Sequence, residues 1–308
     1  MSGTCADARR RSFPGSRLQL VTGRWLWTQV EDMGPGPRQG PSMSWDPVAS
    51  HVLLFGGIVP GSSDPAAPTP MPARPLNDTW NWDGDRWFQV QDSGPPGRGQ
   101  ASLAPAPGVG ALMFGGQYGA RLFNDTWIWD GANWTQVDDD GPGAVDSVMA
   151  FDPGENATFL VGSGTTSTRP TWIWDGAHWT QIHDMTPALE TRLLAWDAPS
   201  QEMVLCGRQS GSGRFLTFAW AQMMWVPLSD MGPREPVLAV FSSSHGVVAR
   251  TAAETWLWDR KVKRWTQVQN MGGRFEQQPA AAWDVEHGFG VLFDGLEGKT
   301  WRLTPPPA

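Results

Sequence analysis

The segment Trp-Thr-Gln-Val, or a close relative of it, recurs along this 308-residue chain at a spacing of about 45 residues. Each copy begins with a tryptophan, and the six copies start at Trp27, Trp87, Trp134, Trp179, Trp225 and Trp265. Upstream of most copies stands a threonine followed by an aromatic residue: Thr79-Trp80, Thr126-Trp127, Thr171-Trp172, Thr217-Phe218 and Thr255-Trp256. A period of this length is that of a propeller blade, in which each repeat is one small sheet.

Each repeat carries the pattern of four short strands. The first strand ends in an aromatic residue followed by aspartate, as at Trp45-Asp46, and the second is an apolar run that ends at Phe55 in the first repeat. The third is the Thr-Trp segment and the fourth is the Trp-Thr-Gln-Val segment, joined by a short link that contains glycine. Alternation along these strands places their tryptophans on one face. The content of 36 glycines and 27 prolines agrees with an all-β chain rich in turns.

The two ends of the repeat region complement each other. The segment at 27–30 has the form of a fourth strand with no third strand before it, whereas the segment at 300–303 has the form of a third strand with no fourth strand after it. We therefore expect the N-terminal strand to complete the last blade, because closing the ring removes the free edges of an open stack. The predicted fold is an all-β, six-bladed β-propeller at 24–303. It includes a proline-rich insertion at 58–76 in blade one and is flanked by a flexible tail at 1–23 and a short tail at 304–308.

Short motifs mark the first three repeats: Phe-Gly-Gly, Asn-Asp-Thr-Trp, Trp-Asp-Gly and Trp-Thr-Gln-Val. With these motifs the chain resembles bacterial kelch-repeat proteins of the galactose-oxidase-like propeller superfamily, from about Trp25 to Leu303. Two later repeats depart from the pattern. The fourth reads Thr-Phe-Ala-Trp-Ala-Gln-Met-Met-Trp-Val-Pro-Leu, and the fifth has Ala-Arg-Thr in the place of Phe-Gly-Gly.

All twenty tryptophans can be assigned to positions of the repeat. We interpret them as wedges between neighbouring sheets rather than as an aromatic ligand site, because a ligand site would more naturally break the repeat than obey it. The threonine of the third strand is interpreted as a β-former whose hydroxyl bonds locally. A carboxylate or amide five residues after each fourth-strand tryptophan is interpreted as a turn former rather than part of a metal ring: Asp32, Asp92, Asp139, Asp184, Asp230 and Asn270.

The sequence offers no complete catalytic set, and we expect no enzyme, no cofactor and no metal. Galactose oxidase activity, which the family resemblance brings to mind, needs two tyrosines and two histidines at a copper ion, and Tyr118 is the sole tyrosine of this chain. The histidines fall in predicted turns, at His51, His178, His183, His245 and His287. The segment Gly298-Lys299-Thr300 lacks the upstream glycine of a phosphate-binding loop.

Net charge and hydropathy limit the classes of partner that this chain is expected to bind. A net charge of -8 argues against nucleic acid or an anionic membrane as the main partner, and no apolar run is long enough to span a bilayer. Two cysteines, Cys5 and Cys206, make neither a disulfide framework nor a metal spacing. As written, the chain has no signal peptide, so we expect a cytoplasmic monomer; an upstream start would place it outside the cytoplasm.

Recognition by propellers uses one end of the ring, and two features fall in the links between blades and between second and third strands. One is the proline-rich insertion at 58–76, read as a semi-rigid flap or a tolerated surface loop. The other is a set of arginines near the start of the first strand, which we predict to bind a carboxylate or an acidic partner: Arg38, Arg98, Arg234 and Arg274. Replacing Arg38 and Arg98 by alanine is expected to weaken anion binding without changing the melting temperature.

Two functions stay open. The first is a non-enzymatic kelch propeller, a rigid platform that binds a protein or polymer through its loop face. The alternative is a protein that binds a carbohydrate or sugar acid, or an isomerase-like enzyme, on the same scaffold. A deep pocket with convergent polar groups would favour the alternative over the platform.

Overall fold

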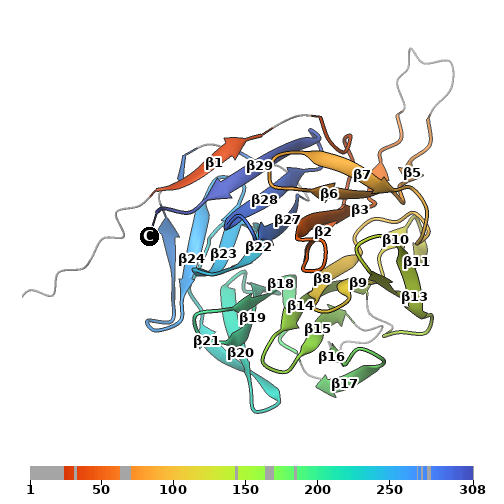
Figure 1. Cartoon of the computed structure of the whole chain (residues 1–308). Helices are drawn as coiled ribbons and strands as arrows, with labels where there is room; N and C mark the ends of the chain where they lie inside the picture. Colours follow the sequence, from red (N-terminus) through yellow and green to blue (C-terminus); the bar gives the residue numbers. More distant parts are fainter. Residues whose placement is uncertain are drawn as a thin grey trace, which may run out of the picture.

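The computed structural model describes residues 24–30, 33–62, 71–142, 145–163, 170–183, 186–268, 270–271, 273–275 and 279–307. These residues form small twisted sheets arranged around a common centre, so the chain is an all-β propeller (Figure 1). The predicted tail at 1–23 and the middle of the proline-rich insertion, residues 63–70, lie outside the described residues.

Each blade is a four-stranded antiparallel sheet in which the strands follow one another outward from the centre. Blade one contains β2 (Ser42–Asp46), β3 (His51–Phe55), β6 (Thr79–Trp82) and β7 (Trp87–Gln91). Blade two contains β8 (Ser102–Ala106), β9 (Gly110–Phe114), β12 (Thr126–Trp129) and β13 (Trp134–Asp138). Blade three contains β14 (Val145–Asp152), β15 (Ala157–Ser163), β16 (Thr171–Trp174) and β17 (Trp179–His183). Blades four and five contain β18 (Leu189–Asp197), β19 (Glu202–Gln209), β20 (Phe215–Ala221) and β21 (Met224–Ser229), then β22 (Val237–Ser243), β23 (Gly246–Thr251), β24 (Thr255–Asp259) and β25 (Arg264–Val268). Two small hairpins, β4 (Ile58–Val59) with β5 (Arg74–Pro75) and β10 (Gln117–Tyr118) with β11 (Arg121–Leu122), extend the links between second and third strands.

Blade six joins the two ends of the repeat region. Its first three strands are β27 (Ala280–Asp284), β28 (Phe289–Asp294) and β29 (Lys299–Thr304), and its fourth is β1 (Trp25–Gln29). Trp27 lies opposite Leu303 in the antiparallel pair of β1 with β29, and β26 (Asn270–Met271) adds a short parallel strand on the other side of β1. The first strands of neighbouring blades contact each other all around the centre, from β2 through β8, β14, β18 and β22 to β27 and back to β2. The prediction of six blades closed by the N-terminal strand is confirmed.

A hydrogen bond between blades repeats around the whole ring. The fourth-strand tryptophan of each blade donates its indole Nε1 to the threonine Oγ1 in the third strand of the preceding blade, at 2.7 to 3.0 Å. The six pairs are Trp27–Thr255, Trp87–Thr300, Trp134–Thr79, Trp179–Thr126, Trp225–Thr171 and Trp265–Thr217. The prediction that these hydroxyls bond locally was therefore wrong: each accepts a hydrogen bond from the next blade. The tryptophans do act as wedges between sheets, as the sequence predicts.

Aromatic packing fills the space around these bonds. In blades one to five, the second tryptophan of the third strand packs on the fourth-strand tryptophan, with ring centroids 5.1 to 5.5 Å apart. The phenylalanine of the Phe-Gly-Gly motif meets the fourth-strand tryptophan of the next blade edge to face, as in Phe55 with Trp134 at 5.3 Å. Such aromatic pairs contribute about 0.5–1.5 kcal/mol each beyond the area that they bury.

In blade five, a buried arginine takes the position that phenylalanine holds in the Phe-Gly-Gly motif. Arg250 stands in the register position of Phe55, is fully buried, and lies over the rings of Trp27 and Phe275 at 5.1 and 4.7 Å. Its guanidinium donates to the Thr255 hydroxyl and to the carbonyl oxygen of Gly273. Burial lowers the pKa of Arg250 to about 10, so the side chain is still a cation at neutral pH. The unusual motif of the fifth repeat is thus part of the scaffold.

Candidate functional site

Two of the four predicted ligand-binding arginines are buried and internally paired. Arg38 forms a two-pronged ion pair with Asp78, at 2.7 and 3.0 Å, and also donates to the carbonyl oxygens of Gly36 and Gly56. Arg98 repeats this arrangement in blade two with Asp125 and the carbonyl oxygen of Gly115. Replacing Arg38 and Arg98 by alanine is therefore expected to lower the melting temperature rather than leave it unchanged. Each substitution removes one partner of an ion pair and leaves the charge of the other partner uncompensated.

The other two predicted arginines, Arg234 and Arg274, are exposed. Anion binding by this set stays a prediction. Within the same residues, no three His, Cys, Asp or Glu side chains are grouped so as to hold a metal ion. Asp32 and Asp184 of the aspartate register, and the side chain of Asn270, lie outside the described residues.

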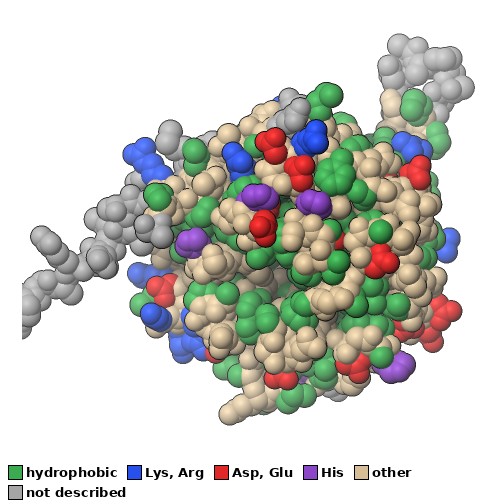
Figure 2. Space-filling model, viewed as in Figure 1, with side chains coloured by type: hydrophobic (Ala, Val, Ile, Leu, Met, Phe, Trp, Pro, Cys, Tyr) green, Lys and Arg blue, Asp and Glu red, His purple; other side chains and the backbone are tan. Residues whose placement is uncertain are grey.

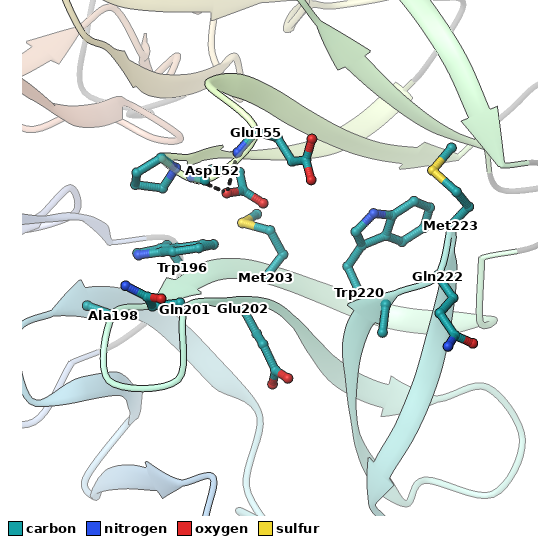
Figure 3. Close-up of a pocket in the computed structure, with 13 residues that line it drawn as sticks. Asp152, Glu155, Trp196, Ala198, Gln201, Glu202, Met203, Trp220, Gln222 and Met223 are labelled. Atoms are coloured by element: carbon teal, nitrogen blue, oxygen red, sulfur yellow. Dashed lines mark hydrogen bonds between the residues drawn. The ribbon is translucent and has the colours of Figure 1, made fainter.

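A cavity of about 710 Å³ opens between blades three and four, and we call it the interblade groove (Figure 3). Its walls are three turns at one end of the ring: the β14–β15 turn, the β18–β19 turn and the β20–β21 turn. The lining residues are 152–155, 196, 198, 201–203 and 220–223. This volume lies within the range of roughly 300–1,000 Å³ that small-molecule sites occupy.

At the groove, one tryptophan is less buried than its counterparts in the other blades. Trp220 is half-buried, whereas the corresponding Trp82, Trp129, Trp174 and Trp258 are buried. Between blades one and two, Trp129 donates its Nε1 to Asp46 at 3.0 Å, which closes the boundary. Between blades three and four, Asp152 holds the place of Asp46 and has no such bond from Trp220. Trp220 packs instead on Phe159 and His183, with ring centroids 5.5 and 6.0 Å away.

The hairpin at the rim of the groove has an unusual backbone. Gln222 and Met223 both have left-handed conformations, with φ of 51° and 62°. The corresponding turns of blades one to three place a glycine there, as at Gly131 with φ of 95°. Two consecutive non-glycine residues in this region of φ carry strain, and such strain concentrates at sites of function. The exposed side chains of Gln222 and Met223 thereby face the groove.

The polar groups of the groove are acidic or amide. Asp152 Oδ1 accepts the backbone N–H groups of Gly154 and Glu155 at 2.8 and 3.2 Å, which fixes the β14–β15 turn. Glu202 forms a two-pronged ion pair with Arg260 of blade five, at 2.5 and 3.1 Å. In Figure 3, Trp196 and Trp220 flank Met203, and Glu155 extends along the opposite wall. None of the lining residues is lysine or arginine.

A second cavity, of about 530 Å³, lies at the opposite end of the ring. It is lined by the link before blade one and by the base of the proline-rich insertion, and includes Arg38, Asp78 and Arg74. This is the end at which the sequence predicts recognition. Its central charges, Arg38 and Asp78, already satisfy each other.

Sequence reasoning missed the interblade groove, and it assigned both groove tryptophans to the scaffold alone. Trp196 and Trp220 occupy repeat positions, yet both are half-exposed and line the cavity. The available signal was the broken motif of the fourth repeat, where Ala-Gln-Met-Met replaces the usual aspartate–glycine turn.

Comparison with known proteins identifies the fold. No protein-family model matches the chain, and no curated protein matches it by sequence, so the kelch resemblance is not confirmed. The solved structure of the SapL1 lectin in complex with alpha methyl fucoside is similar, with a TM-score of 0.58 and 14% sequence identity over 90% of this chain and 94% of that chain. Across the described residues, no helix is long and apolar enough to cross a membrane. The chain is a six-bladed β-propeller with a lectin among its structural neighbours.

Proposed function

We propose that this propeller binds carbohydrate and that the interblade groove is its binding site. The observation that carries the proposal is the pair of half-buried tryptophans, Trp196 and Trp220, that line one cavity together with carboxylate and amide side chains. The kelch assignment is proposed alongside it, on the motifs of the first three repeats.

The chemistry of the groove matches that of a sugar ring. A pyranose has an apolar C–H face that packs on an indole, and a rim of hydroxyls that both donate and accept hydrogen bonds. Carboxylate oxygens of Asp152 and Glu155 would accept from hydroxyls, and the amides of Gln201 and Gln222 can do both. The cavity is open to solvent, so it has room for a terminal or internal sugar of a longer glycan.

The structural neighbour supports this choice over the protein platform, because it is itself a propeller lectin with a bound sugar derivative. The sequence identity is too low to transfer its ligand, so the ligand of this chain has to be found by experiment.

The test is a saccharide panel that includes neutral, amino and acidic sugars, screened by thermal shift with wild-type protein and with three alanine variants. Trp196→Ala and Trp220→Ala should each weaken binding about twofold to tenfold, since an aromatic face contributes about 0.5–1.5 kcal/mol. Trp45→Ala is the matched control, because Trp45 is the half-buried counterpart of Trp196 in blade one. A panel with no saturable shift, or equal binding by all variants, would reject the proposal.

A further inference from the structure

The charged residues that line the interblade groove are all acidic. Its lining residues include the acids Asp152, Glu155 and Glu202 and no lysine or arginine. Arg260 pairs with Glu202 from blade five and offsets that one charge. The negative charges of Asp152 and Glu155 therefore give the groove its net charge. In Figure 2, the lysine and arginine side chains on the visible face lie mostly toward its margins.

Both remaining acids have oxygens available to a ligand. Asp152 uses Oδ1 for the turn, and among the described residues its Oδ2 has no hydrogen-bond partner. Glu155 is exposed, and its carboxylate has no partner in the same part of the chain. The other titratable groups nearby are Asp197, whose pKa is raised by burial, and His183 against the ring of Trp220.

On this basis we infer that the interblade groove selects amino sugars, with a free protonated amine, over neutral and acidic sugars; the inference rests on the proposed function. An ammonium group has three donors and no acceptor, which matches a site whose unpaired oxygens belong to Asp152 and Glu155. The faces of Trp196 and Trp220 add attraction for a cation, because the indole face is the negative end of its quadrupole. A sugar carboxylate would meet like charge in the same place.

The experiment is calorimetric titration of wild-type protein at pH 6 with matched sugars that differ only at one substituent. The probes are glucosamine, glucose, N-acetylglucosamine and glucuronic acid, together with galactosamine, galactose, N-acetylgalactosamine and galacturonic acid. The amine should bind about twofold to fivefold tighter than the neutral sugar of the same series, as expected for a partly exposed charge pair. Raising ionic strength from about 0.01 M to about 1 M should remove most of that difference.

Two variants connect the selectivity to its cause. Glu155→Gln should reduce the ratio of amine affinity to neutral-sugar affinity about threefold, because it removes one charge while the amide keeps an oxygen that accepts hydrogen bonds. Glu286→Gln, in the corresponding turn of blade six, is the matched control and should change neither. Neutral sugars that bind as tightly as amino sugars, or acidic sugars that bind tighter, would overturn the inference and leave the proposed function standing. Failure of every sugar to bind would overturn both.

Discussion

One residue pair, an indole N–H on a threonine hydroxyl, joins each blade to the blade before it. The pair explains two sequence features at once: the repeated tryptophan of the fourth strand and the repeated threonine of the third strand. Threonine is required there as an acceptor as well as a β-former, because the indole N–H is buried and would otherwise be unsatisfied.

Thr217→Val tests this role at one boundary. Valine keeps the shape of threonine and removes the acceptor of the buried Trp265 indole, so the free energy of unfolding should fall by about 1–3 kcal/mol. Urea denaturation measures the change. Thr266→Val, at an exposed position next to Trp265, is the control and should alter stability by less than about 0.5 kcal/mol. Equal effects of the two substitutions would contradict the account.

At the scale of the element, buried arginine–aspartate pairs fasten the link that enters a blade to the start of its third strand. Arg38 with Asp78 and Arg98 with Asp125 do this in blades one and two. Both aspartates also accept the indole N–H of the tryptophan two residues later, as Asp125 does from Trp127 at 2.8 Å. The Asn-Asp-Thr-Trp motif therefore makes two connections. Its aspartate pairs with the arginine of the link that enters the blade, and its threonine accepts the indole N–H of the next blade.

Arg98→Met should lower the free energy of unfolding by about 1–3 kcal/mol, because it leaves the half-buried carboxylate of Asp125 with Trp127 as its remaining side-chain donor. Arg234→Met, at an exposed arginine of the predicted set, should change it by less than about 0.5 kcal/mol. Chemical denaturation of both variants distinguishes a structural role for Arg98 from a surface one.

The same pair has a pH signature. Burial by itself raises the pKa of Asp125, but the hydrogen bonds from Arg98 and Trp127 outweigh it, so the pKa lies below its ordinary value of 3.8. A carboxyl with a lowered folded pKa stabilises the fold above its unfolded pKa, and this contribution is lost as the pH falls through the folded value. Between about pH 5 and pH 2, wild type should therefore lose stability more steeply than Arg98→Met.

The molecule is a closed ring, and its repeat is regular enough for the fold to be predicted from the sequence. The proposed site lies at blade four, where the repeat motif is broken. The closure of blade six was predictable because Trp27 and Thr300 each lack a partner segment in the sequence and supply one to the other. The partners of Arg38 and Arg98 were not predicted, because spacing along the chain places a side chain near an end of a blade without showing which way it points.

The groove could not be predicted for a related reason. It is made by three turns that belong to two blades, and Trp220, which packs on Phe159, is only half-buried at its wall. Packing between neighbouring sheets decides how far a side chain at a blade boundary is buried, and periodicity along the chain does not encode that packing. The broken motif of blade four marks the place only after the fold is known.

The indole N–H signals of the tryptophans provide the most direct test of the central claim. A ¹H–¹⁵N spectrum recorded during titration with a saccharide that binds should show shifts of the Trp196 and Trp220 signals, assigned with Trp196→Phe and Trp220→Phe. The signals of the six tryptophans bonded to threonine should stay in place. Shifts confined to Trp80, which bonds Asp78 beside the second cavity, or no shift with any saccharide, would contradict a carbohydrate site in the interblade groove.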